Sequence, residues 1–174
     1  DLCNDLGNLV SRTLAMITQY NGGIIPEPKL EDTEEKDLMT LASDLFKKCS
    51  GHMNTQRVDL YVNEIFAVIR SANKYIDITE PWRLAKDPSK KDKLDTVLYT
   101  LSETLRIVTV LLQAVMFEVP AKIFVKFGTP SDLQTFDSIK SFKKDNFGLK
   151  VNKGENLFPR LDVAKEIEFL DTPN

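Results

Sequence analysis

The chain has 174 residues, 42% of them hydrophobic, which suits the core of one compact domain rather than two. Its 23 basic and 26 acidic side chains give a net charge of −3. This balance excludes the global cationic field that drives nonspecific binding to nucleic acids, so any contact with RNA must be local and specific.

Apolar residues recur at helical spacing from the start of the chain. A first helix is expected over residues 2–20, and Asn21-Gly22-Gly23 ends it because glycine tolerates the left-handed conformation that often follows a helix. The polar side of this helix carries Asn8 and Arg12, which are four positions apart and therefore neighbours on its surface. We expect both side chains to point into solvent.

A helix break is expected at Glu80-Pro81. Proline lacks a backbone donor and disfavours helix in the preceding residue, so the third helix should stop near Thr79 and a short new helix should start at Pro81. Trp82, the only tryptophan, lies in the first turn of that short helix, where its ring either plugs the core or serves as a stacking platform. The second to fifth long helices are predicted over residues 32–50, 54–78, 90–119 and 120–127.

Helical periodicity fades after Gly128. Charged residues, glycines and isolated phenylalanines mix over residues 131–162, which indicates an irregular tail over 129–174 that lies along the helices or reaches toward something else. One last short helix is predicted over residues 162–170. Short connections between long amphipathic helices favour antiparallel neighbours, so the predicted fold class is all-α, an antiparallel helix bundle over residues 1–128 followed by this C-terminal tail.

No residue pattern typical of an enzyme occurs in the sequence. A phosphate-binding glycine loop, a nucleophile elbow and a metalloprotease motif are all missing, and His52, the single histidine, is best explained as a solvated or capping residue. Cys3 and Cys49 have no metal-binding spacing and are interpreted as reduced thiols of a cytosolic protein. The sequence therefore predicts no catalytic residue and no metal site.

Neither secretion nor a membrane span is indicated. The N-terminus lacks the charged, apolar and small-residue regions of a signal peptide. The most apolar run, residues 107–119, is shorter than the roughly 20 residues that a membrane helix needs, so we expect it to be a buried core helix. The first residues already have helical periodicity and no initiator methionine, which indicates that the chain begins inside a larger protein.

Asn8, Arg12 and Trp82 stand out from a plain helix bundle. Asparagine and arginine four positions apart can offer donors and an acceptor to base edges, and an exposed tryptophan can stack on a base. Spacing alone favours the simpler reading, a solvated polar face and a core tryptophan. A protein-interaction surface centred on an exposed Trp82 is a further alternative.

Four segments, in order, resemble the anticodon-binding domain of bacterial methionyl-tRNA synthetases. The strongest is Asn73-Lys74-Tyr75-Ile76-Asp77 followed by Pro81-Trp82-Arg83-Leu84-Ala85-Lys86. The others are Asp5-Leu6-Gly7-Asn8-Leu9-Val10-Ser11-Arg12, Leu94-Asp95-Thr96-Val97-Leu98-Tyr99 and Asn156-Leu157-Phe158-Pro159-Arg160-Leu161-Asp162. The resemblance covers nearly the whole chain and is weakest over residues 129–150.

This resemblance implies a helix bundle of the class I synthetase type that reads the CAU anticodon of methionine tRNA. In the family, the residues matching Asn8 and Arg12 contact anticodon bases, and the tryptophan matching Trp82 stacks on the first of them. Pro81 is expected to fix the angle of that ring. Asn73 is expected to be a supporting neighbour of the site.

The resemblance also defines what this chain is expected to lack. The nucleotide-binding motifs of the family's catalytic domain and its zinc-binding insertion are absent, so methionine activation with ATP and Mg belongs to the parent ligase and no cofactor is expected in this chain. The expected partners are methionine tRNA and the catalytic domain of the same polypeptide, toward which residues 129–174 could pack. The isolated chain is expected to be a monomer, because the C-terminal dimerisation domain of many relatives is also missing. The expected location is the cytoplasm.

Two alternatives stay open at this point. The chain could be the anticodon-binding domain of a related class I synthetase of the isoleucyl, valyl, leucyl or cysteinyl type. It could also be a helical protein-interaction module in which Trp82 is the central contact residue.

Overall fold

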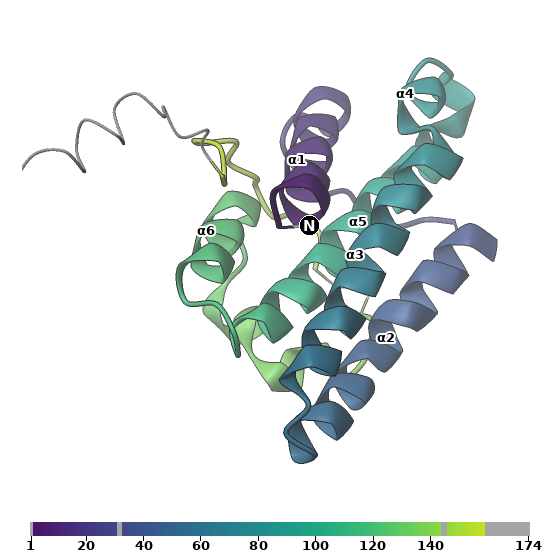
Figure 1. The fold of residues 1–174 in the computed structure, drawn as a ribbon. Coiled ribbons are helices and arrows are strands. Elements are labelled where there is room, and N and C mark those ends of the chain that lie inside the picture. Colours follow the sequence, from purple (N-terminus) through teal and green to yellow (C-terminus); the bar gives the residue numbers. More distant parts are fainter. Residues whose placement is uncertain (1, 31–32, 144–145, 159–174) are drawn as a thin grey trace, which may run out of the picture.

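The computed structural model describes residues 2–30, 33–143 and 146–158, and within them the chain forms a helical bundle (Figure 1). The predicted helix over 162–170 lies outside the described residues. The helices are the π-helical turn η1 (Leu2–Gly7), α1 (Asn8–Asn21), α2 (Thr33–Asn54), α3 (Val58–Thr79), α4 (Pro81–Leu84), α5 (Lys91–Leu112) and α6 (Glu118–Phe127). Three short 3₁₀ turns complete them, η2 (Pro88–Lys90), η3 (Ser131–Gln134) and η4 (Phe136–Ile139). The all-α prediction is confirmed.

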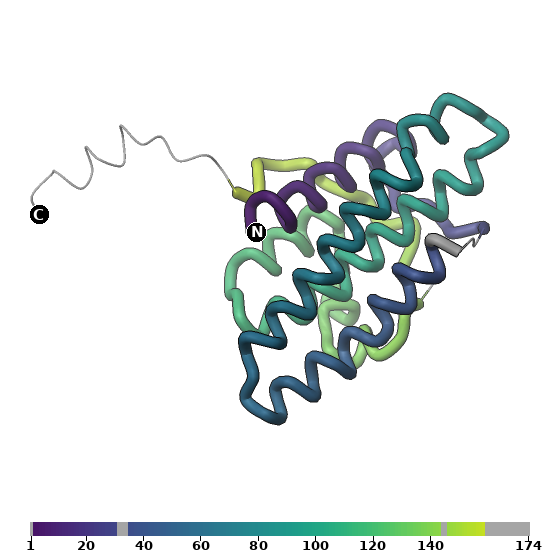
Figure 2. Tube along the Cα trace, turned by 45° about the vertical axis from the view of Figure 1, so that its right-hand side comes forward, coloured from purple at the N-terminus to yellow at the C-terminus, as the bar shows by residue number. Residues whose placement is uncertain are grey.

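Helix α5 is the centre of the bundle. It contacts α1, α2, α3, α4 and α6, and every residue from Leu94 to Leu112 is buried. Figure 2 shows α2, α3 and α5 as three long helices side by side, with α1 running alongside α3. A helix enclosed on all sides must satisfy its polar groups internally. Thr96 does so by accepting the backbone N–H groups of Lys29 and Leu30 in the connection before α2.

The predicted end of the second helix and the predicted start of the third are wrong. The second helix does not stop at Ser50-Gly51, since α2 continues to Asn54. A glycine inside a helix costs stability but does not by itself end it. The chain reverses instead at Gln56, which adopts a positive φ of 57°, so α3 begins four residues later than predicted.

The long fourth helix was expected to reach Val119 but ends at Leu112. The apolar pattern continues through Val115 and Met116, which pack on the core from a turn rather than from a helix. Phe117 in the same turn is 96% exposed. Periodicity therefore could not show this break, since the turn residues carry the same hydrophobicity as the helix before them.

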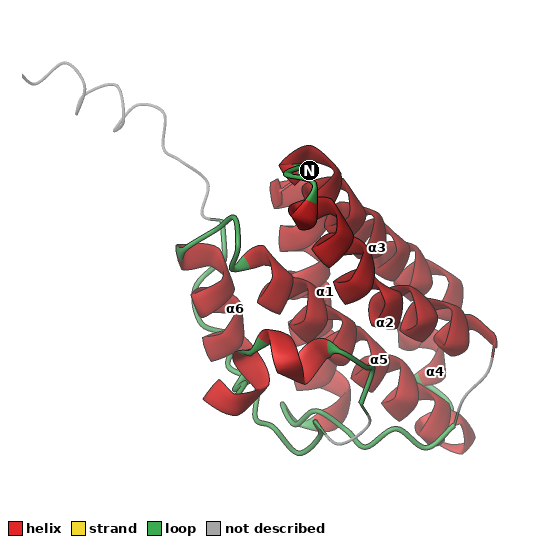
Figure 3. Cartoon of the chain, turned by 90° about the horizontal axis from the view of Figure 1, so that it is seen from below, coloured by secondary structure: helices red, strands yellow, loops and turns green. Residues whose placement is uncertain are grey.

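The described part of the tail packs against the helices. Its backbone pairs with the segment after α1, through Ile25 N–H to Leu149 O at 2.9 Å and Val151 N–H to Gly23 O at 2.8 Å. Seen from below, this region consists of loops and short turns, with no strand drawn among the described residues (Figure 3). Phe158 returns to η1, where a side chain added at Gly7 would meet its ring at 2.9 Å.

Candidate nucleic-acid interface

Two polar contacts join α1 to α3. The Asn8 amide Nδ2 donates to Asn73 Oδ1 at 3.3 Å, and Arg12 Nη2 donates to Asp77 Oδ1 at 2.7 Å. Each helix advances by four residues between the two contacts, so α1 and α3 run in the same direction here. The structure therefore places Asn8 and Arg12 on one face together with Asn73. The expectation that both point freely into solvent is wrong for Arg12, which is half-buried and held against α3.

Asn73 links three elements at this face. Its Nδ2 donates to the carbonyl of Asp5 in η1 at 3.0 Å and to that of Ile69 in α3 at 3.3 Å, while its Oδ1 accepts from Asn8. The Asp5 carboxylate in turn lies 3.6 Å from Arg70 Nη1. With its amide committed in this way, Asn73 holds Asn8 in place, which is the arrangement expected of a supporting neighbour.

Asp77 is a member of this face that the sequence analysis did not select. It lies four residues after Asn73, as Arg12 lies four residues after Asn8. This matching spacing was visible in the sequence but has meaning only if the two helices are adjacent.

The corner after α3 forms as predicted at Pro81. Helix α3 ends at Thr79, Glu80 takes a left-handed conformation, and Pro81 opens the single turn of α4. Pro81 is buried whereas Trp82 is 39% exposed, so the tryptophan is not a fully buried core plug. Figure 1 shows α4 at the end of the bundle toward which α1 runs.

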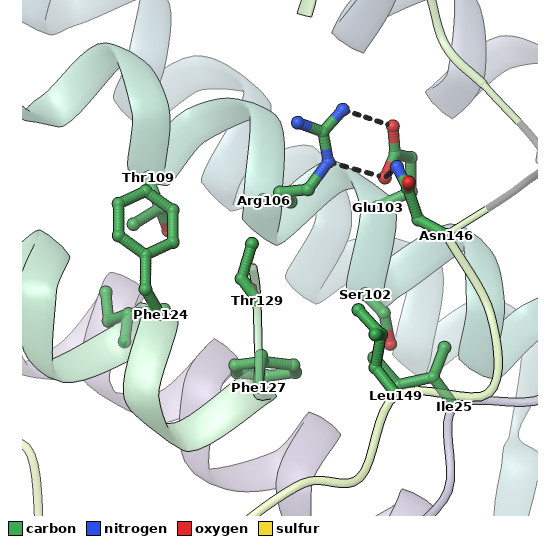
Figure 4. A pocket seen from close by; sticks show the side chains of 11 residues that line it. Ile25, Ser102, Glu103, Arg106, Thr109, Phe124, Phe127, Thr129, Asn146 and Leu149 are labelled. Atoms are coloured by element: carbon green, nitrogen blue, oxygen red, sulfur yellow. Dashed lines mark hydrogen bonds and ion pairs between the residues drawn. The ribbon is translucent and has the colours of Figure 1, made fainter. Parts of the chain in front are cut away.

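A second cluster of polar side chains lies inside the fold. Arg106 on α5 donates from Nη2 and Nε to the two carboxylate oxygens of Glu103 at 2.7 and 2.9 Å, beside Asn146 (Figure 4). Asn146 Nδ2 also donates to Glu103 at 2.8 Å. The cavity that these residues line has a volume of about 10 Å³, enough for at most one water molecule. This cluster is therefore structural.

Among the described residues, no group of three or more His, Cys, Asp and Glu side chains is placed to hold a metal ion, and no helix is long and apolar enough to cross a membrane. Cys3 is exposed and Cys49 is buried, and both thiols are free. Burial raises the pKa of the Cys49 thiol to about 12, which makes it unreactive.

Comparison with known protein sequences finds relatives that match the chain over almost its full length. No family model matches it. It is 47% identical over 172 residues to the methionine–tRNA ligase of Clostridium tetani, covering 99% of this chain and 26% of that protein. The enzyme of Caldanaerobacter subterraneus is 43% identical over 171 residues, covering 98% and 27% respectively. The chain thus spans about a quarter of the length of the curated relatives it matches.

Comparison of the fold with solved structures finds the same family of proteins. The free form of the methionyl-tRNA synthetase of Mycobacterium tuberculosis matches the structure with a TM-score of 0.86 and 29% identity, over 93% of this chain and 33% of that one. Its complex with methionyl-adenylate matches with a TM-score of 0.86 and 30% identity.

Proposed function

The chain is a homologue of one segment of the methionyl-tRNA synthetase family, and we propose that this segment reads the CAU anticodon of methionine tRNA. The observation that carries the proposal is that Asn8 and Arg12, both on α1, are held side by side against α3. The end of α3 is followed directly by the turn that carries the partly exposed Trp82. These are the groups needed to read base edges and to stack on a base.

The side chains retain hydrogen-bonding capacity for bases. The Asn8 amide donates one hydrogen to Asn73, and the side-chain oxygen of Asn8 can still accept a hydrogen bond from a base. Arg12 has five N–H donors and uses Nη2 on Asp77, so the rest of its guanidinium can donate to base acceptors. A wrong base would leave such groups unpaired, which is the physical basis of strong discrimination.

Stacking supplies the affinity in this mechanism. A base stacked on an aromatic ring contributes about 1–3 kcal/mol, and it requires no dense array of phosphate contacts. A chain with a net charge of −3 can therefore bind RNA through a local site. Pro81, buried beneath the corner, sets the direction in which the Trp82 ring is presented.

The remaining functions are proposed for the rest of the longer protein. The catalytic domain of the same polypeptide would use ATP, methionine and Mg, and this chain would contribute recognition of the tRNA and no cofactor of its own. Residues 1–128 form the anticodon-binding bundle in this proposal, and residues 129–174 pack along it or toward the catalytic domain. We propose that the protein works in the cytoplasm, where translation takes place. We also propose that the isolated chain is a monomer.

Binding to hairpin RNAs that carry the anticodon stem and loop tests the proposal. Trp82 is the only tryptophan, so its fluorescence in the 174-residue chain reports stacking directly. A hairpin with the CAU loop should quench this fluorescence, and the same hairpin with its first anticodon base changed should bind more weakly. Equal binding of both hairpins would contradict anticodon reading. Preference for a non-CAU loop would assign the chain to a related synthetase instead.

A further inference from the structure

Glu80 has an unusual backbone for its residue type. Its φ of 44° and ψ of 60° are left-handed, and among the described residues only one other non-glycine residue, Gln56, has a positive φ. A side chain makes this conformation costly, and glycine is the usual residue there. Strained backbone of this kind is often retained where it serves a function.

The backbone groups of Glu80 close one helix and open the next. Its N–H donates to the carbonyl of Ile76 at 3.1 Å, which caps α3. Its carbonyl accepts from the N–H of Arg83 at 2.7 Å and from that of Leu84 at 3.3 Å, which starts α4. A single residue thus sets the angle between the helix that carries Asp77 and the turn that carries Trp82.

Glycine would keep this geometry but would lose a second contact. The Glu80 carboxylate lies 2.8 Å from Arg83 Nη1, so an ion pair spans the two residues between them, Pro81 and Trp82. The backbone bond from Arg83 to Glu80 closes the same short loop. Trp82 is therefore held between two tied residues, directly after a buried proline whose φ is fixed.

We propose that Glu80 is a positioning residue for Trp82, acting through its left-handed backbone and through the ion pair of its carboxylate with Arg83. The ring is then oriented for stacking before RNA arrives, which removes part of the ordering cost of binding. The consequence for RNA affinity rests on the proposed function. The restraint on the ring itself does not.

The exposure of the pair makes this role separable from a role in folding. The side chain of Arg83 is 72% exposed, and exposed ion pairs contribute little to stability. Removing the carboxylate should therefore change Trp82 and leave the bundle folded.

The test uses variants of the 174-residue chain. Glu80→Gln keeps the side-chain length without its charge, Glu80→Gly keeps the left-handed backbone without the side chain, and Glu80→Arg combined with Arg83→Glu reverses the pair. Three quantities are measured for each: quenching of Trp82 fluorescence by acrylamide, affinity for the CAU hairpin RNA, and the melting temperature. Glu118→Gln, which breaks the exposed Glu118–Lys122 pair on α6, is the matched control.

We expect Glu80→Gln and Glu80→Gly to increase acrylamide quenching and to weaken CAU binding roughly twofold to fivefold, with nearly unchanged melting temperatures. The reversed pair should restore both readouts, and high salt should remove the difference between Glu80→Gln and the unaltered chain. The control should match the unaltered chain throughout.

Unchanged quenching in Glu80→Gln and Glu80→Gly would overturn the proposal. Failure of the reversed pair to restore quenching would refute the ion pair as its cause. If the unaltered chain binds no hairpin, the proposed function fails, and acrylamide quenching still decides whether Glu80 restrains the ring.

Discussion

Arg12 on α1 donates to Asp77 on α3 at 2.7 Å, and this ion pair lies one helical turn beyond the Asn8–Asn73 amide contact. Two segments separated by 65 residues thereby share one polar face. The Asp77 side chain is 64% exposed, so it holds Arg12 and also presents a negative charge to the surroundings. An anionic RNA that is not fixed by correct base contacts would be repelled by it.

Asp77→Asn should reduce discrimination between anticodons. The amide keeps the shape of the side chain but loses its charge, so Arg12 is held less firmly and the repulsion of RNA phosphates falls. We expect tighter binding of all hairpins and a smaller ratio between the CAU hairpin and one with a changed first base. Fluorescence titrations at fixed salt measure this ratio. Asp137→Asn, which breaks another exposed pair, with Lys140, is the control, and an unchanged ratio in Asp77→Asn would contradict the assignment.

Trp82→Ala should weaken binding of the CAU hairpin roughly 5-fold to 150-fold, the equivalent of a lost stack of about 1–3 kcal/mol. Trp82→Phe should retain part of the affinity because phenylalanine keeps an aromatic face. Both variants lose the tryptophan fluorescence, so anisotropy of a labelled hairpin is the measurement. Because the ring is only 39% exposed, Trp82→Ala also removes packed apolar surface and should lower the melting temperature, so binding is compared at a temperature at which each variant is folded. Equal affinity of Trp82→Ala and the unaltered chain would exclude stacking on this ring.

Local rules were sufficient for the corner at Pro81 but not for the polar face between α1 and α3. The break before Pro81 follows from the covalent structure of proline, so the end of α3 and the start of α4 could be predicted. The contact of Arg12 with Asp77 depends on α1 lying parallel to α3, which no helical period reveals. The resemblance selected the candidate residues Asn8, Arg12 and Trp82, while the contacts that hold Asn8 and Arg12 are visible only in the three-dimensional arrangement.

The errors at helix ends have a common origin. The Ser50-Gly51 pair predicts a stop, but a glycine costs a helix only about 1 kcal/mol, which the packing of α2 can offset. Val115 and Met116 fall inside the helix predicted over residues 90–119, yet they reach the core from a turn. A hydrophobic pattern indicates which residues are buried. It does not show where a helix ends, because that also depends on tertiary contacts.

Arg106→Met should lower the free energy of unfolding by about 3–5 kcal/mol, because it leaves the buried Glu103 carboxylate without its bidentate partner. Adding Glu103→Gln should recover part of the loss, since no unpaired charge then remains. Urea denaturation measures both variants. Arg57→Met, which breaks an exposed pair with Asp59, should have little effect. Similar losses from Arg106→Met and Arg57→Met would contradict the structural role of the buried pair.

Only one of the two thiols should react in the folded chain. Burial first, and the nearby Glu64 charge second, raise the pKa of Cys49 to about 12, so this thiol stays protonated at pH 8. A thiol reagent should label exposed Cys3 quickly and Cys49 only after unfolding. Cys49→Ser should abolish the slow phase alone. Rapid labelling of two thiols without denaturant would show that Cys49 is accessible.

The same raised pKa predicts how stability depends on pH. The folded value lies above the ordinary thiol value of 9.0, so unfolding releases a proton from Cys49 between these two pKa values. The contribution of this thiol to stability is therefore complete below pH 9 and is lost as pH rises toward 12. Comparing urea denaturation of the unaltered chain and Cys49→Ser across this range isolates it. A difference between them that does not change with pH would contradict the assignment.

Gly128 and Gly22 form a natural matched pair for testing how the tail docks. Both follow a helix with a φ of 60°, but a Cβ at Gly128 would lie 2.5 Å from the carbonyl oxygen of Lys150, whereas nothing lies within 4 Å of one at Gly22. Gly22→Ala should therefore cost only the left-handed strain of about 1–2 kcal/mol. Gly128→Ala should cost clearly more, because it must also push away the backbone that pairs with Gly23 through Val151. Urea denaturation gives both losses, and faster hydrogen exchange of the Val151 amide in Gly128→Ala alone would locate the damage. Equal losses would mean that the tail yields without cost.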